Sequence, residues 1–200
     1  MRKALPFARF ALLIAAAVSS ASASEAGSRF GSACDVLSPD EGRVTITMEQ
    51  RVAAVREQHA KLRALANLRL PEARAMILVM LSSGHRTFTN LSYVATRDET
   101  GIWTVDRFGR TTSEFSDTPP EVEPVTINIL SESAGKSLDA LVADDCLYSQ
   151  PFMTAQNGLP PLNGWSTGLA VITPKRKYAG YASGPISSIG GKIVTAVTGW

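Results

Sequence analysis

Two serines lie in short patterns that can support nucleophilic catalysis. Ser166 lies in Gly164-Trp165-Ser166-Thr167-Gly168, a G-x-S-x-G pattern that exposes a serine where a strand turns sharply into a helix. Here a loop rich in proline and glycine precedes the serine, and a predicted strand follows it. Both histidines, His59 and His85, come before Ser166, whereas this motif places its histidine after the serine. We therefore expect Ser166 to belong to a turn before a strand, although another fold could use another chain order.

The second pattern, Ser133-Ala134-Gly135-Lys136, fits S-x-x-K, which places a lysine amine one helical turn from a serine. These four residues resemble the motif of penicillin-binding proteins and serine β-lactamases, but no K-T-G pattern accompanies them. The simpler interpretation is that Ser133 caps a helix and Lys136 is solvated. Gly135-Lys136-Ser137 also resembles the end of a phosphate-binding loop, but Leu130 stands where its first glycine belongs. The sequence therefore assigns no residue to catalysis and predicts no cofactor.

The two cysteines, Cys34 and Cys146, are predicted to form a disulfide, the simplest state of an even pair in an oxidising compartment. The bridge would close a loop of about 112 residues and stabilise the fold by roughly 4–5 kcal/mol in the chain-entropy model. Lipidation of Cys34 is the alternative, because small residues precede it. No spacing of histidines and cysteines predicts a metal site. Asp144-Asp145 is weak support for calcium, and helix-end solvation or a local salt bridge explains it better.

Residues 1–23 predict a secretory signal peptide. Arg2, Lys3 and Arg9 give a positive start, residues 11–18 form a short apolar run, and Ala21-Ser22-Ala23 is a small-x-small cleavage signal. The apolar run is about half the length of a membrane-spanning helix, so no transmembrane segment is predicted. We expect the mature chain to begin near Ser24 and to be periplasmic or secreted.

Removal of the signal peptide changes the charge of the chain. The full chain has 20 basic and 18 acidic residues, and the signal peptide contains three basic residues and no acidic ones, which leaves 17 against 18. A nearly neutral domain has no general electrostatic attraction to nucleic acid or to anionic lipid. The remaining length of about 177 residues is enough for one domain with its own core.

The pattern of apolar residues predicts helices and strands in an irregular order. After a tail over residues 24–42, Thr47 and Gln50 form a capping box for a helix that ends before Pro71. His59 is expected on this helix as a boundary residue, between its buried and exposed sides, and His85 in a turn. The later elements are a strand favoured over a helix at 75–81, strands at 87–96 and 102–106 around a turn at 98–101, a strand with one buried face at 125–129, a helix at 133–144, and a hairpin joining 169–172 to 178–182.

Two segments, residues 109–124 and residues 150–166, are predicted to be long surface loops. Residues 186–200 fit either a weak amphipathic helix or a strand, and the pair Gly190-Gly191 argues against one uninterrupted helix. The sum is an α+β fold, an antiparallel sheet of about five strands with two packed helices in a single domain over 43–200. In outline, a helix followed by an antiparallel sheet resembles secreted cystatin-like or nuclear-transport-factor-2-like domains.

Since no nucleophile, base and orienting group can be assembled, the favoured function is non-catalytic binding of a small ligand or of an envelope protein. Trp165, beside Asn163 in the second predicted loop, is the candidate contact residue. A small periplasmic serine hydrolase that uses Ser166 or Ser133 is one alternative. An envelope scaffold that binds through one of the two long loops is the other.

Overall fold

Helix α1 (Met48–Ala64) begins with the predicted capping box. The Thr47 hydroxyl accepts a hydrogen bond from the Gln50 N–H at 3.2 Å, and the Gln50 amide oxygen accepts one from the Thr47 N–H at 2.7 Å. This exchange satisfies two backbone donors at the helix start. The helix ends before Pro71, because Asn67 takes the left-handed conformation (φ 58°) and the Leu68 N–H bonds to the carbonyl of Arg63.

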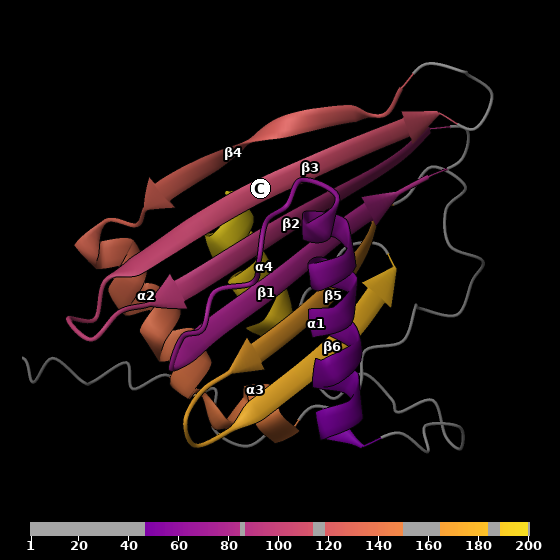
Figure 1. Cartoon of the computed structure of the whole chain (residues 1–200). Coiled ribbons are helices and arrows are strands. Elements are labelled where there is room, and N and C mark those ends of the chain that lie inside the picture. Colours follow the sequence, from indigo (N-terminus) through magenta and orange to yellow (C-terminus); the bar gives the residue numbers. More distant parts are fainter. Residues whose placement is uncertain (1–46, 85–86, 114–118, 150–164, 184–188, 200) are drawn as a thin grey trace, which may run out of the picture. The chain divides into compact units, whose positions relative to one another are not determined.

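Six strands form one antiparallel sheet in a computed structural model that describes residues 47–84, 87–113, 119–149, 165–183 and 189–199. Their order across the sheet is β4-β3-β2-β1-β5-β6 (Figure 1). The described residues all belong to one unit of the chain, Ala33–Trp200. The strands are β1 (Ala75–Ser83), β2 (Thr87–Arg97), β3 (Trp103–Ser113), β4 (Glu121–Ile129), β5 (Trp165–Ile172) and β6 (Lys177–Ser183).

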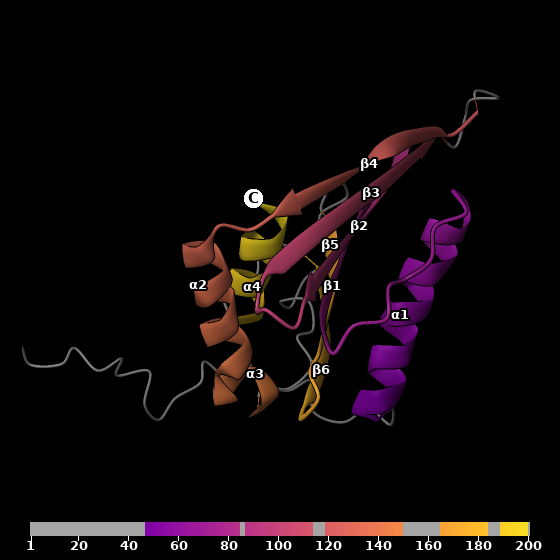
Figure 2. The ribbon, with the colours of Figure 1, turned by 60° about the vertical axis from the view of Figure 1, so that its left-hand side comes forward.

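Helices lie on both faces of this sheet, α1 on one and α2 (Glu132–Ala143), α3 (Asp145–Ser149) and α4 (Ile189–Thr198) on the other (Figure 2). The predicted α+β class is confirmed, with six strands and four helices in place of about five and two. Strand side chains alternate between faces, so β1 supplies both cores. Ile77 and Val79 pack in the cluster that contains α2 and α4, whereas Leu78 packs beneath α1. The apolar run at 75–81 is therefore a strand buried on both sides.

The predicted turn at residues 98–101 joins β2 to β3. The Asp98 carboxylate accepts hydrogen bonds from the Thr100 hydroxyl at 2.7 Å and from the Ile102 N–H at 2.8 Å. These bonds, that of Thr100 first, lower the pKa of the Asp98 carboxyl. Gly101 has φ 91°, a conformation that favours glycine. The turn thus fixes the chain where Trp103 enters β3.

The structure around strand β4 shows that two predictions are wrong. Residues 109–113 and 121–124 are strand and do not belong to a loop over 109–124, while residues 114–118 lie outside the described residues. Residues 125–129 are strand as predicted, but Ile127 and Ile129 are 66% and 73% exposed, so the expected buried face is wrong. The physical reason is placement: α1 packs mainly on β6, β5, β1 and β2, and β4 lies at the edge beyond them.

The helices after β4 correct one further prediction and decide between helix and strand near the end of the chain. Ser131, and not Ser133, caps α2: its hydroxyl accepts a hydrogen bond from the Ala134 N–H at 3.3 Å. Helix α4 begins at Ile189, so the buried pair Gly190-Gly191 lies in its first turn, and residues 186–188 lie outside the described residues. Burial of Ile193 and Val197 against the core stabilises α4.

Several predictions fall on residues outside the described ranges. These include the signal peptide, the tail over 24–42, Cys34, His85 and residues 150–164 of the second loop. The disulfide between Cys34 and Cys146 therefore stays a prediction. Within the described part of the chain, no helix is both long enough and apolar enough to cross a bilayer.

Helix α1 buries a polar cluster against the sheet, so the prediction that His59 lies at a boundary is wrong. His59 and Ser92 are both 0% exposed, with 2.7 Å between the His59 Nδ1 and the Ser92 Oγ. One helical turn further, Arg63 donates to both carboxylate oxygens of Asp106, at 3.2 and 2.7 Å. His59 and Arg63 share a helix face because they are four residues apart.

Candidate binding site

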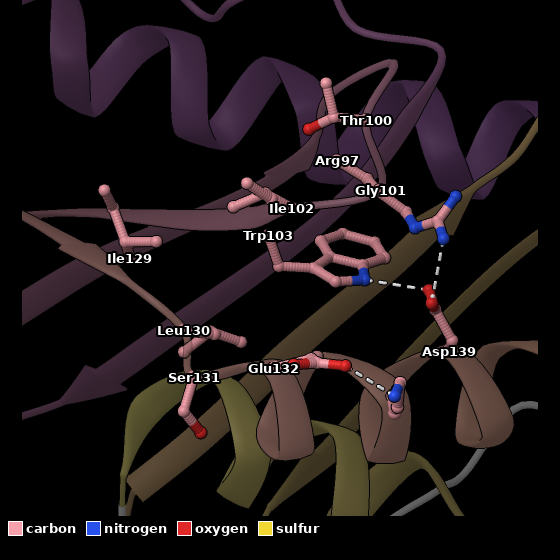
Figure 3. A pocket seen from close by; sticks show the side chains of 12 residues that line it. Arg97, Thr100, Gly101, Ile102, Trp103, Ile129, Leu130, Ser131, Glu132 and Asp139 are labelled. Carbon is pink, nitrogen blue, oxygen red and sulfur yellow. Dashed lines mark hydrogen bonds and ion pairs between the residues drawn. The ribbon is translucent and has the colours of Figure 1, made fainter.

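The candidate site is a pocket of about 520 Å³ at one end of the sheet, where the β2–β3 turn, the end of β4 and helix α2 meet (Figure 3). This volume is within the range of sites that hold small molecules. The pocket is lined by Arg97, residues 100–103, residues 129–132, and Gly135, Lys136 and Asp139 of α2.

One carboxylate organises the polar part of this pocket. Asp139 accepts a hydrogen bond from the Trp103 indole N–H on Oδ1 and one from the Arg97 guanidinium on Oδ2, each at 2.9 Å (Figure 3). The Trp103 ring is buried, while about a third of the Asp139 and Arg97 side chains is exposed. Both carboxylate oxygens of Asp139 are therefore already engaged by donors of the protein itself.

Helix α2 presents Gly135 and Asp139 to the same side, since residues four apart share a helix face. A Cβ atom on Gly135 would lie 3.6 Å from the Trp103 Cδ1, an ordinary contact distance. Gly135 is itself buried. The glycine therefore lets the backbone of α2 pack closely against the edge of the Trp103 ring.

The walls of the pocket combine apolar side chains with balanced charges. Ile102 is 48% exposed and offers apolar surface at the rim of the pocket, whereas the side chain of Ile129 points away from Trp103 and Asp139 (Figure 3). Lys136 pairs with Glu132 at 2.6 Å on the outer side, where both side chains are mostly exposed. With the pair formed by Arg97 and Asp139, the lining holds two charges of each sign. It is suited to an amphipathic ligand without a strong net charge.

Neither serine motif meets the geometry of a nucleophile in the structure. Ser166 lies within β5, and its hydroxyl donates a hydrogen bond to the Ser82 carbonyl at 3.2 Å. The Ser133 hydroxyl lies 3.1 Å from that of Ser131, and the Lys136 ammonium is paired with Glu132. Residues 165–168 of the G-x-S-x-G pattern are thus part of a strand, and the S-x-x-K pattern lies in the first turn of α2.

Trp165 opens β5 and does not lie in the loop where the sequence placed it. It pairs with Ser83 of β1, and its half-buried side chain packs against the larger core cluster. It is not among the residues that line the pocket. Its role as a ligand contact stays a prediction.

The hydrogen-bonded His59 and Ser92 resemble two members of a catalytic triad in distance alone. No substrate can reach them, because both side chains are fully buried beneath α1. Burial first, and the charge of Arg63 second, lower the pKa of His59 to about 3, so the imidazole is neutral. This pair belongs to the packing between helix and sheet.

The carboxylates of Asp144 and Asp145 each bond to another group of the protein. The Asp144 carboxylate accepts a hydrogen bond from the Cys146 N–H at 2.8 Å, and Asp145 forms an ion pair with Arg176. The Arg176 guanidinium also lies over the Tyr148 ring, 4.4 Å from its centroid. Within the described ranges, no group of three or more histidine, cysteine, aspartate and glutamate residues could hold a metal ion.

Sequence reasoning missed Arg97, Trp103 and Asp139 as members of one site. Asp139 is 36 residues from Trp103 and 42 from Arg97 along the chain, so no local spacing links them. The one available signal was the pairing of Gly135 with Asp139 at helical spacing, which marks a side of α2 that can approach a large ring.

Known proteins give no further guide to this pocket. No family model matches the chain, and neither a curated protein nor a solved structure matches it.

Proposed function

We propose that this protein is an exported, non-catalytic binding protein whose pocket above Trp103 holds a small amphipathic ligand. One observation carries the proposal: the polar groups of the pocket already bond to one another, while an apolar side chain at its rim remains exposed. Asp139 is held by Trp103 and Arg97, yet Ile102 faces solvent. Such a lining gains free energy by covering apolar surface.

The two serines also favour binding over hydrolysis. A serine nucleophile needs a base within hydrogen-bond reach and access for the substrate. Ser166 donates to a backbone carbonyl, and the Lys136 amine that would activate Ser133 is paired with Glu132. These contacts support the binding function over the hydrolase alternative.

The pocket should bind N-phenyl-1-naphthylamine, an uncharged dye whose fluorescence rises in apolar surroundings. We expect the Ile102→Asp variant to weaken binding about tenfold, because it replaces an apolar wall with a charge and loses about 1–2 kcal/mol of burial. Fluorescence titration of the purified protein measures both dissociation constants.

The matched control is Val122→Asp, since Val122 is 51% exposed and lies outside the pocket. It should bind the dye as the parent protein does. Equal weakening in both variants, or a parent protein that does not bind the dye, would contradict the assignment of the pocket.

One measurement of the intact mass of the protein tests both its export and its single disulfide. Protein isolated from the envelope fraction of its own host should have the mass of residues 24–200 less the two hydrogens lost in one bridge. Native mass spectrometry of the same sample should show any ligand that it retains. A retained signal peptide, free thiols or a lipid on Cys34 would overturn the proposed compartment.

A further inference from the structure

The two edges of the sheet differ in how their outward backbone groups are covered. At the β6 edge, the Ala179 N–H donates to the Met48 Sδ at 3.0 Å, so the start of α1 occupies an outward backbone donor. At the other edge, no strand of the described residues pairs with the outer side of β4 (Figure 1). An exposed row of backbone donors and acceptors is a template for another strand.

The direction of the β4 backbone follows from one hydrogen bond. The Leu130 N–H donates to the Trp103 carbonyl at 2.9 Å, so the backbone groups of Leu130 point toward β3. Residues in an antiparallel ladder alternate, which turns Asn128 and Thr126 toward β3 as well. The N–H and C=O groups of Ile127 and Ile129 therefore point away from the sheet.

A bulge sets one limit of this edge. Arg107 pairs with Thr126 and Gly109 with Glu123, so β4 carries one extra residue between these pairs. Pro124 lies there, where a missing N–H costs no ladder bond. At the other limit, Ser131 caps α2 and the chain leaves the sheet. Regular pairing runs from Thr126 to Ile129, while Val125 lies beside Pro124 in the bulge, and no residue from Val125 to Ile129 is charged.

We propose that β4 pairs with β4 of a second copy of this chain, antiparallel and centred on Ile127. A two-fold axis at this residue places Ile127 opposite its counterpart, Val125 opposite Ile129, and Thr126 opposite Asn128. Every β-branched apolar side chain then faces another, and each polar one faces a polar one. The segment is complementary to itself, which an unrelated strand would match only by chance.

The exposed apolar side chains fit the same arrangement. Ile127 pairs with Asp106, whose side chain bonds to Arg63 of α1, so Ile127 and Ile129 lie on the α1 face of the sheet. Joined edges would bring the Val125, Ile127 and Ile129 side chains of both copies into one apolar row. No charged residue within the segment opposes its own copy. The short pairing length implies a weak dimer, with a dissociation constant on the order of 10–100 µM.

Sedimentation velocity of the full mature protein at rising concentration tests the dimer. We expect a dimer in the parent protein and at least a tenfold weaker association in Ile127→Lys, which places two ammonium groups at the axis. Val122→Lys is the matched control: it has a similar exposed side chain on the same strand, beyond the bulge, and should dimerise as the parent does.

Hydrogen exchange identifies the edge independently. The backbone N–H groups of Ile127 and Ile129 should exchange more slowly as the parent protein dimerises, and should not do so in Ile127→Lys. A monomer at every concentration, or equal loss of dimer in both lysine variants, overturns the proposal. Slow exchange in a monomer overturns it too, since another part of the same chain would then cover the edge.

Discussion

Replacing Asp106 with alanine should lower the free energy of unfolding by about 3 kcal/mol, because it leaves the Arg63 guanidinium buried without its partner. Arg63 is 2% exposed and donates two hydrogen bonds to that carboxylate. About a quarter of the Asp106 side chain is exposed. The expected loss of stability is therefore at the lower end of the range for breaking a buried ion pair. Urea unfolding of the parent and variant, followed by circular dichroism, measures the change.

Arg63→Met is the informative comparison. It removes the buried charge, retains an apolar chain of similar length, and leaves a carboxylate that water can reach. It should cost clearly less than Asp106→Ala. An equal or larger loss in Arg63→Met would show that the packing of the arginine stem, and not its stranded charge, determines the effect.

Acid should destabilise the protein through His59, by about 2 kcal/mol between pH 7.5 and pH 5. The pKa of the native imidazole is lowered from 6.5 to about 3, by burial first and by the Arg63 charge second. The unfolded chain takes up a proton near pH 6.5 and the native protein does not, so protonation favours unfolding. The contribution is complete above pH 6.5, is lost as the pH falls, and changes no further below pH 3.

The control is His59→Gln, whose amide can still bond to the Ser92 hydroxyl and does not titrate. Its free energy of unfolding should vary by about 2 kcal/mol less than that of the parent over this pH range. Urea unfolding at several values above pH 5 avoids the range where most carboxylates titrate. Parallel curves for the two proteins would show that His59 is not the titrating group.

The sequence predicts those parts of the fold that depend on neighbours in the chain. The capping box of Thr47 and Gln50 and the turn at residues 98–101 form as expected, because each is fixed by hydrogen bonds within four residues. The strand at residues 75–81 follows from a short, continuous apolar run. The hairpin of β5 and β6 also forms as predicted.

The predictions fail where packing between residues far apart in the chain determines the structure. The burial of His59 depends on Ser92, 33 residues away, and nothing in the helix pattern marks it. The sequence leaves helix and strand open near the end of the chain, and α4 forms because its apolar side joins the core. Exposure of β4 depends on which strands α1 covers. The pocket at Trp103 is the same kind of case, since its three polar partners come from separate elements.

The arrangement of β1 has a consequence for how the chain acquires its structure. Its β2 partner follows at once, whereas its β5 partner lies near the other end of the chain, with Met76 opposite Ile172. Helix α1 packs on β1 and β2 but also on β5 and β6, and 131 residues separate Met48 from Ala179. Such long closures slow folding to milliseconds or longer. A chain emerging N-terminus first would thus keep the part of α1 that packs on β5 and β6 exposed until its last hairpin arrived.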